Sequence, residues 1–179
     1  MKKPMFLLTA VLLVIYLSLR ATAAIKEPEV WPTYTPEGAG YSVQVPGTMT
    51  GEDQMIQLGD ERWILQQGRM EWMEVAYTAA YGDLPEIFTS RPPEEILDRM
   101  VKATADPDYK LVHQEAFTLE GYPGVYGEYE TPDGDKSLMK CCIRDQRLYR
   151  LIACIPRDKM ESTRQHYEKF LNSLTFLRP

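Results

Sequence analysis

The sequence has few of the residues from which catalytic and metal sites are built. Its 179 residues include only two histidines, His113 and His166, and three cysteines. A metal site needs three or four converging ligands, and neither histidine has further ligand residues at helical or turn spacing. Residues 40–44 (Gly-Tyr-Ser-Val-Gln) begin like the G-x-S-x-G nucleophile motif but lack its final glycine. We therefore predict no catalytic residue, no metal site and no cofactor.

Motifs for binding phosphate, calcium and nucleic acid are also missing. The sequence has no glycine-rich phosphate-binding loop, and Asp133-Gly134-Asp135 lacks the spacing and the terminal glutamate of a calcium loop. Lys and Arg number 20 against 26 Asp and Glu, for a formal net charge of −6, and no long basic run occurs. Because phosphate contacts need clustered Lys and Arg, this balance argues against nucleic-acid binding.

The chain does not have the composition of a disordered or fibrous protein. Apolar residues make up 44% of it, and it contains 11 Tyr, 5 Phe and 3 Trp. This composition and length are enough to bury a core without disulfides or a structural metal. We expect a single domain.

The N-terminus has the pattern of an export signal. The basic start Met1-Lys2-Lys3-Pro4 precedes a nearly apolar run, 5–19, that is shorter than the roughly 20 residues of a membrane span. Small residues follow, and cleavage after Ala23 satisfies the A-x-A rule. Cleavage after Ala24 is an alternative, and the charge of Arg20 also suits an uncut N-terminal anchor. We expect a signal peptide at 1–23 and a periplasmic or extracellular mature protein.

The cysteines are Cys141, Cys142 and Cys154. Our first interpretation is that they are buried small hydrophobic residues, because an odd number in a chain of this size does not suggest a disulfide framework. A bridge from Cys154 to one of the other two is an alternative in an exported protein. A reactive or metal-binding thiol is the least supported, since no C-x-x-C pair or neighbouring histidine is present.

Hydrophobic periodicity divides the rest of the chain into strands and two helices. Period-two alternation predicts strands, and a period of 3.6 predicts amphipathic helices. The expected strands span 40–47, 54–58, 62–67, 71–81, 109–118, 125–131, 136–144 and 148–155. One expected helix begins at Pro93, and the other runs over about 159–174. Asp158 and Glu161 have the spacing of a capping box for the last helix.

Short turns between successive strands predict an antiparallel meander. Strands covered by helices in this order predict an α+β fold: an antiparallel sheet of about six to eight strands flanked by helices. The domain is expected over 41–178, after an irregular lead-in at 24–40 that is rich in Pro, Gly and Glu.

Three segments resemble the PsbP-like family. Residues 41–47 (Tyr-Ser-Val-Gln-Val-Pro-Gly) resemble its opening strand, 119–124 (Leu-Glu-Gly-Tyr-Pro-Gly) its mid-chain turn, and 170–176 (Phe-Leu-Asn-Ser-Leu-Thr-Phe) its ending. The resemblance spans about 33–178 and includes exported bacterial domains of this type. It implies an antiparallel sheet sandwiched by helices and a binding or assembly role, since PsbP itself is an extrinsic subunit of photosystem II. No catalytic or metal-binding residue transfers.

Several aromatic residues are candidates for a binding surface, because Trp and Tyr dominate interface hot spots. They are Trp63, Trp72, Tyr122 and Tyr126. Trp72 lies opposite the apolar face of its predicted strand, so it is either exposed or covered by the last helix or the lead-in.

These observations favour a non-enzymatic exported domain that contacts a protein partner in the cell envelope. A small-ligand carrier with a pocket between sheet and helix is a second hypothesis. An enzyme built on dispersed acidic and histidine side chains is the third. Contact with a membrane is expected only through an uncut N-terminal segment.

Overall fold

The computed structural model describes residue 28 and residues 30–58, 61–104 and 109–178. Its strands are β1 (Thr33–Tyr34), β2 (Tyr41–Gln44), β3 (Thr50–Leu58), β4 (Glu61–Trp72), β5 (Val75–Asp83), β6 (Lys110–Leu119), β7 (Tyr122–Glu130), β8 (Lys136–Arg144), β9 (Arg147–Ile155) and β10 (Thr175–Phe176). Its helices are α2 (Glu86–Thr89), α3 (Pro93–Thr104) and α4 (Arg164–Asn172), with a 3₁₀ turn at Arg157–Lys159. The N-terminal segment predicted to direct export lies outside the described residues.

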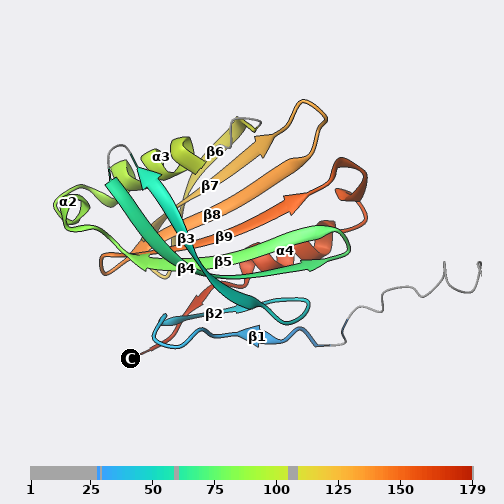
Figure 1. Ribbon diagram of the computed structural model, residues 1–179, viewed down its shortest axis with the longest axis horizontal. Helices are drawn as coiled ribbons and strands as arrows, with labels where there is room; N and C mark the ends of the chain where they lie inside the picture. The colour runs from blue at the N-terminus through green and yellow to red at the C-terminus, as the bar shows by residue number, and fades with distance from the viewer. Residues whose placement is uncertain (1–27, 29, 59–60, 105–108, 179) are drawn as a thin grey trace, which may run out of the picture.

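Most strands belong to one seven-stranded antiparallel sheet with the order β3-β4-β5-β9-β8-β7-β6 (Figure 1). The chain forms β3 to β5 as a meander and passes through α2 and α3. It then forms β6 to β9 as a second meander that returns to β5. A smaller sheet has the order β1-β2-β10 and brings the start and the end of the domain together. The predicted α+β class and antiparallel sheet are confirmed.

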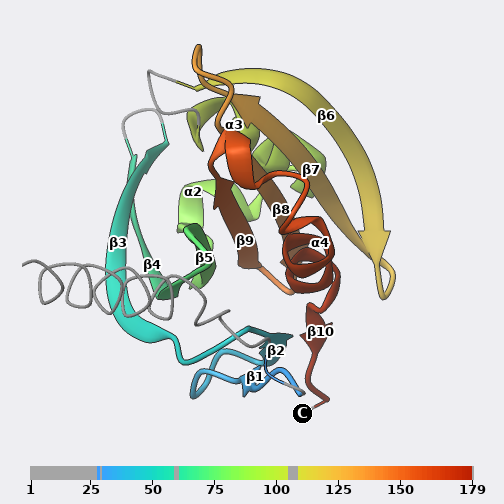
Figure 2. The same ribbon diagram turned by 90° about the vertical axis from the view of Figure 1, so that its right-hand side faces the viewer.

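The large sheet curves, and each of its faces has its own apolar cover (Figure 2). Helices α2 and α3 pack on one face, where Phe88, Ile96 and Met100 are buried. The small sheet and α4 pack on the other face. Strand β5 buries residues toward both sides, because successive side chains of a strand point to opposite faces.

Aromatic contacts dominate the face that meets α4 and the small sheet. Tyr41 of β2 makes edge-to-face contacts with Tyr81 and Tyr149, at ring-centroid distances of 5.9 and 5.5 Å. Tyr77 meets Phe170 of α4 at 5.1 Å in the same geometry. Such pairs add to the free energy gained by burying their apolar area. They fix α4 and β2 against the centre of the sheet.

Several predicted boundaries differ from the structure, and two of the differences have a clear local cause. The strand expected over 71–81 is divided, because Met73 and Glu74 adopt φ values of 51° and 65° and form a two-residue turn between β4 and β5. Such turns usually carry Asn or Gly, and neither residue is present here to indicate a turn. The last helix begins at Arg164, after the 3₁₀ turn, and its N-cap residue Thr163 makes no side-chain cap. The predicted capping box is therefore wrong.

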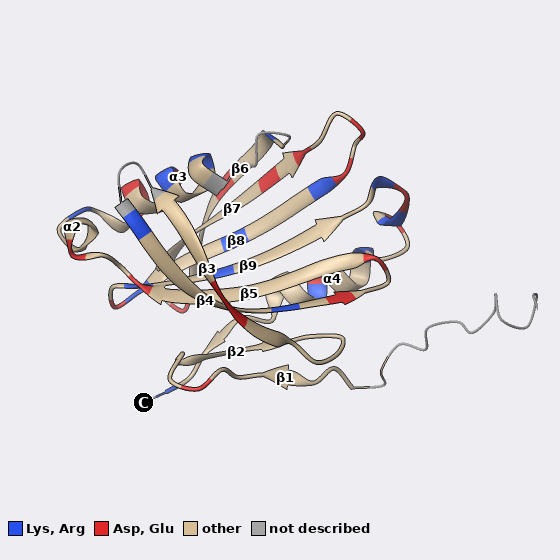
Figure 3. Cartoon of the chain, in the orientation of Figure 1, with Lys and Arg blue, Asp and Glu red and all other residues tan. Residues whose placement is uncertain are grey.

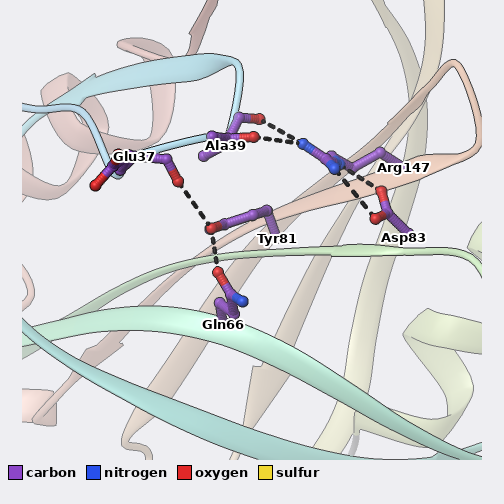
Figure 4. Close-up of polar contacts among 7 residues, drawn as sticks. Glu37, Ala39, Gln66, Tyr81, Asp83 and Arg147 are labelled. Carbon is purple, nitrogen blue, oxygen red and sulfur yellow. Dashed lines mark hydrogen bonds and ion pairs between the residues drawn. The ribbon is translucent and has the colours of Figure 1, made fainter.

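An arginine joins the lead-in to the large sheet (Figure 4). Arg147 Nε and Nη2 donate to Asp83 Oδ1 and Oδ2 at 2.6 and 3.1 Å. Its Nη1 donates to the carbonyl of Gly38 at 2.7 Å and to that of Ala39 at 3.4 Å. These hydrogen bonds from Arg147 hold the pKa of Asp83 below its ordinary value.

Tyr81 makes a second attachment in the same place. Its hydroxyl donates to the Glu37 carbonyl at 3.3 Å and also contacts Gln66 Oε1 (Figure 4). The lead-in, expected to be irregular, thus includes a short strand and is hydrogen-bonded to β5 and β9.

A substitution at Gly124 of β7 tests how closely β6, β7 and β8 pack. A Cβ at this position would lie 2.5 Å from the Phe117 ring and 2.9 Å from the Cys141 carbonyl oxygen. Gly124→Ala should therefore lower the free energy of unfolding by about 1–3 kcal/mol. Gly51→Ala is the matched control, because its nearest atom would be 4.0 Å away. Urea unfolding that shows equal stability for both variants would contradict the packing described.

The ion pair of Asp83 and Arg147 predicts that the stability of the fold depends on pH. The pKa of Asp83 is lower in the folded protein than in the unfolded chain, where it is near 4. The ionised carboxylate therefore stabilises the folded state above about pH 4. This stabilisation is lost as the pH falls through the pKa of the folded state. Because 73% of the Asp83 side chain is exposed, Asp83→Asn should cost less than about 1 kcal/mol at pH 7. At pH 3, Asp83→Asn should no longer lower the free energy of unfolding. Unfolding at pH 7 and pH 3 measures this, with Asp133→Asn, in the turn between β7 and β8, as the control. A cost that grows toward acid would contradict it.

Candidate functional site

The four aromatic residues predicted as a binding surface lie in different places. Trp63 is only 4% exposed and packs in the core under α2 and α3. Trp72 ends β4 on the other side of the sheet. Tyr122 and Tyr126 lie along β7, also on the side of α4 and the small sheet. The four therefore do not form one surface, and Trp63 contributes to the core.

Trp72 is covered by the lead-in and by α4, as one of the two alternatives from the sequence expected. It makes edge-to-face contacts with Trp31 of the lead-in at 6.4 Å and with His166 of α4 at 4.6 Å. Trp31 is 3% exposed, and Lys169 Nζ lies 4.5 Å from the centre of its ring. Trp72 itself is half-buried. This cluster anchors the lead-in to α4.

The tyrosines of β7 are half-buried and have close neighbours. Tyr122 meets Phe176 at 5.6 Å, and the Arg144 guanidinium lies 5.6 Å from the Tyr122 ring. Tyr126 lies 6.1 Å from His113 of the edge strand β6. Burial raises the pKa of Tyr126 to about 12, so its hydroxyl stays protonated at neutral pH.

A pair of exposed apolar residues that the sequence analysis did not single out lies on the ribbon of β3 and β4. Met55 and Ile64 are paired across the two strands and are 62% and 57% exposed. β5 pairs with β4 only from Gln66 onward, so this part of the ribbon extends beyond β5 (Figure 1). A signal was present: in the apolar run 63–65, the middle residue must face away from the other two.

The first interpretation, that the cysteines are buried, is confirmed for Cys141 and Cys142 but not fully for Cys154. All three are free, with Cys141 and Cys142 buried and Cys154 half-buried. Burial raises the pKa of the Cys141 and Cys142 thiols to about 12, which suppresses the reactive thiolate. The alternative of a bridge to Cys154 is wrong.

Neither a metal site nor a membrane-spanning helix is found in the described part of the chain. Residues 28, 30–58, 61–104 and 109–178 contain no group of three or more His, Cys, Asp or Glu placed to hold a metal. Among the same residues, no helix is long and apolar enough to cross a membrane. Acidic and basic residues are interspersed over turns, strands and helices (Figure 3).

Comparison with solved structures identifies the fold. No protein-family model matches the sequence, and a search of the curated proteins finds no match. The solution structure of cyanobacterial PsbP (CyanoP) from Synechocystis sp. PCC 6803 is similar with a TM-score of 0.58 and 15% identity, over 83% of this chain and 94% of that one. LpqN, involved in cell envelope biogenesis of Mycobacterium tuberculosis, is similar with a TM-score of 0.50 and 12% identity, over 82% and 90%. The chain therefore has a PsbP-like fold, as its sequence resemblance indicated.

Proposed function

We propose that this chain is a non-enzymatic binding or assembly domain of the cell envelope, and that it contacts a protein partner through the ribbon of β3 and β4. The observation that carries the proposal is the exposed cross-strand pair Met55 and Ile64. Two large apolar side chains side by side on a strand pair gain free energy when a partner removes them from water.

The place of this pair in the sheet indicates how a partner would bind. β3 is an outer strand of the seven-stranded sheet, so one side of its backbone has no strand neighbour among the described residues. An extended segment of a partner can pair with such an edge through main-chain hydrogen bonds, while its apolar side chains pack on Met55 and Ile64. The other outer strand, β6, is mostly exposed. Its one exposed large apolar side chain is Val112, which is 48% exposed.

The cellular setting is supported by the N-terminal pattern and by the fold. A basic start, a short apolar run and an A-x-A site are typical of export. LpqN, which shares the fold at low identity, is described as involved in cell envelope biogenesis. The sequence also has no complete nucleophile motif, so the role proposed is binding.

Site-specific photo-crosslinking in cells tests the partner surface. A photoreactive amino acid at Met55 should give one predominant protein adduct in the envelope fraction, and Ile64→Thr in the same chain should reduce that adduct at least about fivefold. The same photoreactive residue at Val112 is the matched control on the other edge. No adduct from Met55 in an exported and folded protein, or equal adducts from both positions, would contradict the proposal.

The export prediction has its own measurement. The intact mass of the protein recovered from the envelope fraction should correspond to a chain that begins at Ala24, because the A-x-A rule places the cut after Ala23. A chain that begins at Ile25 would indicate the alternative cut, and a full-length chain in the membrane fraction would indicate the anchor. A full-length chain in the cytosol would contradict export.

A further inference from the structure

The guanidinium of Arg150 is buried in the face of the large sheet that α3 covers. Arg150 lies on β9 between Leu148 and Ile152, which belong to the same side of the sheet. Its residue exposure is 3%, and it pairs in register with Ala80 of β5 and Cys141 of β8. Arginine remains protonated in proteins, so this is a positive charge in an apolar layer. A charge in such a place is expected to have a counter-ion.

No such counter-ion is present in the described part of the chain. Arg150 forms no ion pair with any carboxylate there, and its Nη2 donates a hydrogen bond to Oε1 of Gln54, a neutral amide on β3. The buried Nε–H has no acceptor among the described residues. Burial lowers the pKa of Arg150, because desolvation penalises its charged form. The donor is thus placed for an anion that this part of the chain does not supply.

A cavity of about 270 Å³ lies beside this guanidinium. Gln54, Ala103, Tyr109, Tyr129, Ser137, Arg150, Ile152 and Cys154 line it. These residues come from β3, the C-terminal end of α3 and strands β7 to β9, except Tyr109, which directly precedes β6. Gln54, Ser137 and Cys154 are half-buried, so the cavity communicates with solvent. The Gln54 amide and the Ser137 hydroxyl are further polar groups of the lining, and Ala103, Ile152 and the rings of Tyr109 and Tyr129 supply apolar surface.

We propose that this cavity is a binding site for a small organic carboxylate, with Arg150 as the residue that holds the carboxylate group. Guanidinium and carboxylate match in geometry, and charge-assisted hydrogen bonds between them are stronger than neutral ones. One guanidinium balances one negative charge, so a monoanion fits this low-dielectric site better than a phosphate dianion. The apolar side chain of Ile152 and the ring of Tyr129 would contact the body of the ligand.

The size of the cavity limits the ligand. Its volume of about 270 Å³ is slightly below the roughly 300–1,000 Å³ of pockets for drug-sized ligands. Short aliphatic or small aromatic carboxylates satisfy this limit. The site matches the second hypothesis from the sequence, a pocket between sheet and helix, and it is independent of the partner surface on Met55 and Ile64.

Thermal unfolding of the full chain with defined probes tests the site. Butyrate should raise the unfolding temperature of the wild type by about 2 °C or more at a concentration several times its Kd, and uncharged butyramide should not. Arg150→Met should abolish the butyrate effect, whereas Arg62→Met, at an exposed arginine of β4, should keep it. No rise with butyrate, an equal rise in Arg150→Met, or a rise with inorganic phosphate but not with butyrate would overturn the proposal.

A second measurement uses the wild-type chain, so it stands even where Arg150→Met fails to fold. Cys154 lines the cavity and is half-buried, while Cys141 and Cys142 are buried. Butyrate should slow the reaction of Cys154 with neutral iodoacetamide at least about twofold at saturation, followed by peptide mass spectrometry. Equal rates with butyrate and butyramide would overturn the proposal.

Discussion

The fold depends on covering both faces of the large sheet. Its central strands β5, β9 and β8 bury side chains on both sides, so neither face is stable in water alone. Helices α2 and α3 cover one face of the large sheet, and α4 and the small sheet cover the other. The second cover is assembled from both ends of the domain, since β2 pairs with both β1 and β10. Arg147, at the start of β9, then ties the lead-in to Asp83 at the end of β5.

The two candidate binding features lie where these covers end or are incomplete. The ribbon of β3 and β4 extends beyond β5, and there Met55 and Ile64 stay exposed. On the other feature's face, α2 and α3 bury Phe88, Ile96 and Met100, and a cavity remains beside Arg150 near the C-terminal end of α3. One feature is an apolar surface suited to a protein, and the other is an enclosed polar donor suited to a small anion. Both are consistent with a domain that binds rather than catalyses.

The sequence predicted the architecture better than the site. Alternation over Val75, Tyr77 and Ala79 indicated a half-buried strand because burial there follows the period of two. The turn at Met73 and Glu74 was missed because residues with positive φ there are neither Gly nor Asn. Trp63 was predicted to be on the surface because local periodicity does not show which side a distant helix covers. Arg150 was not singled out, since an arginine within a strand usually points to water, and its burial depends on α3 and β3, which are far away in the sequence.

The central claim is that the edge at β3 is open in the isolated domain and occupied in the envelope. Amide hydrogen exchange measures this directly, because exchange rates report the opening of each strand. The protein is compared alone and after recapture from solubilised envelope. We predict slow exchange in β5, β8 and β9 in both samples, and protection of β3 that appears only after exposure to the envelope. Identical exchange of β3 in the two samples, with β5, β8 and β9 protected in both, would contradict the account.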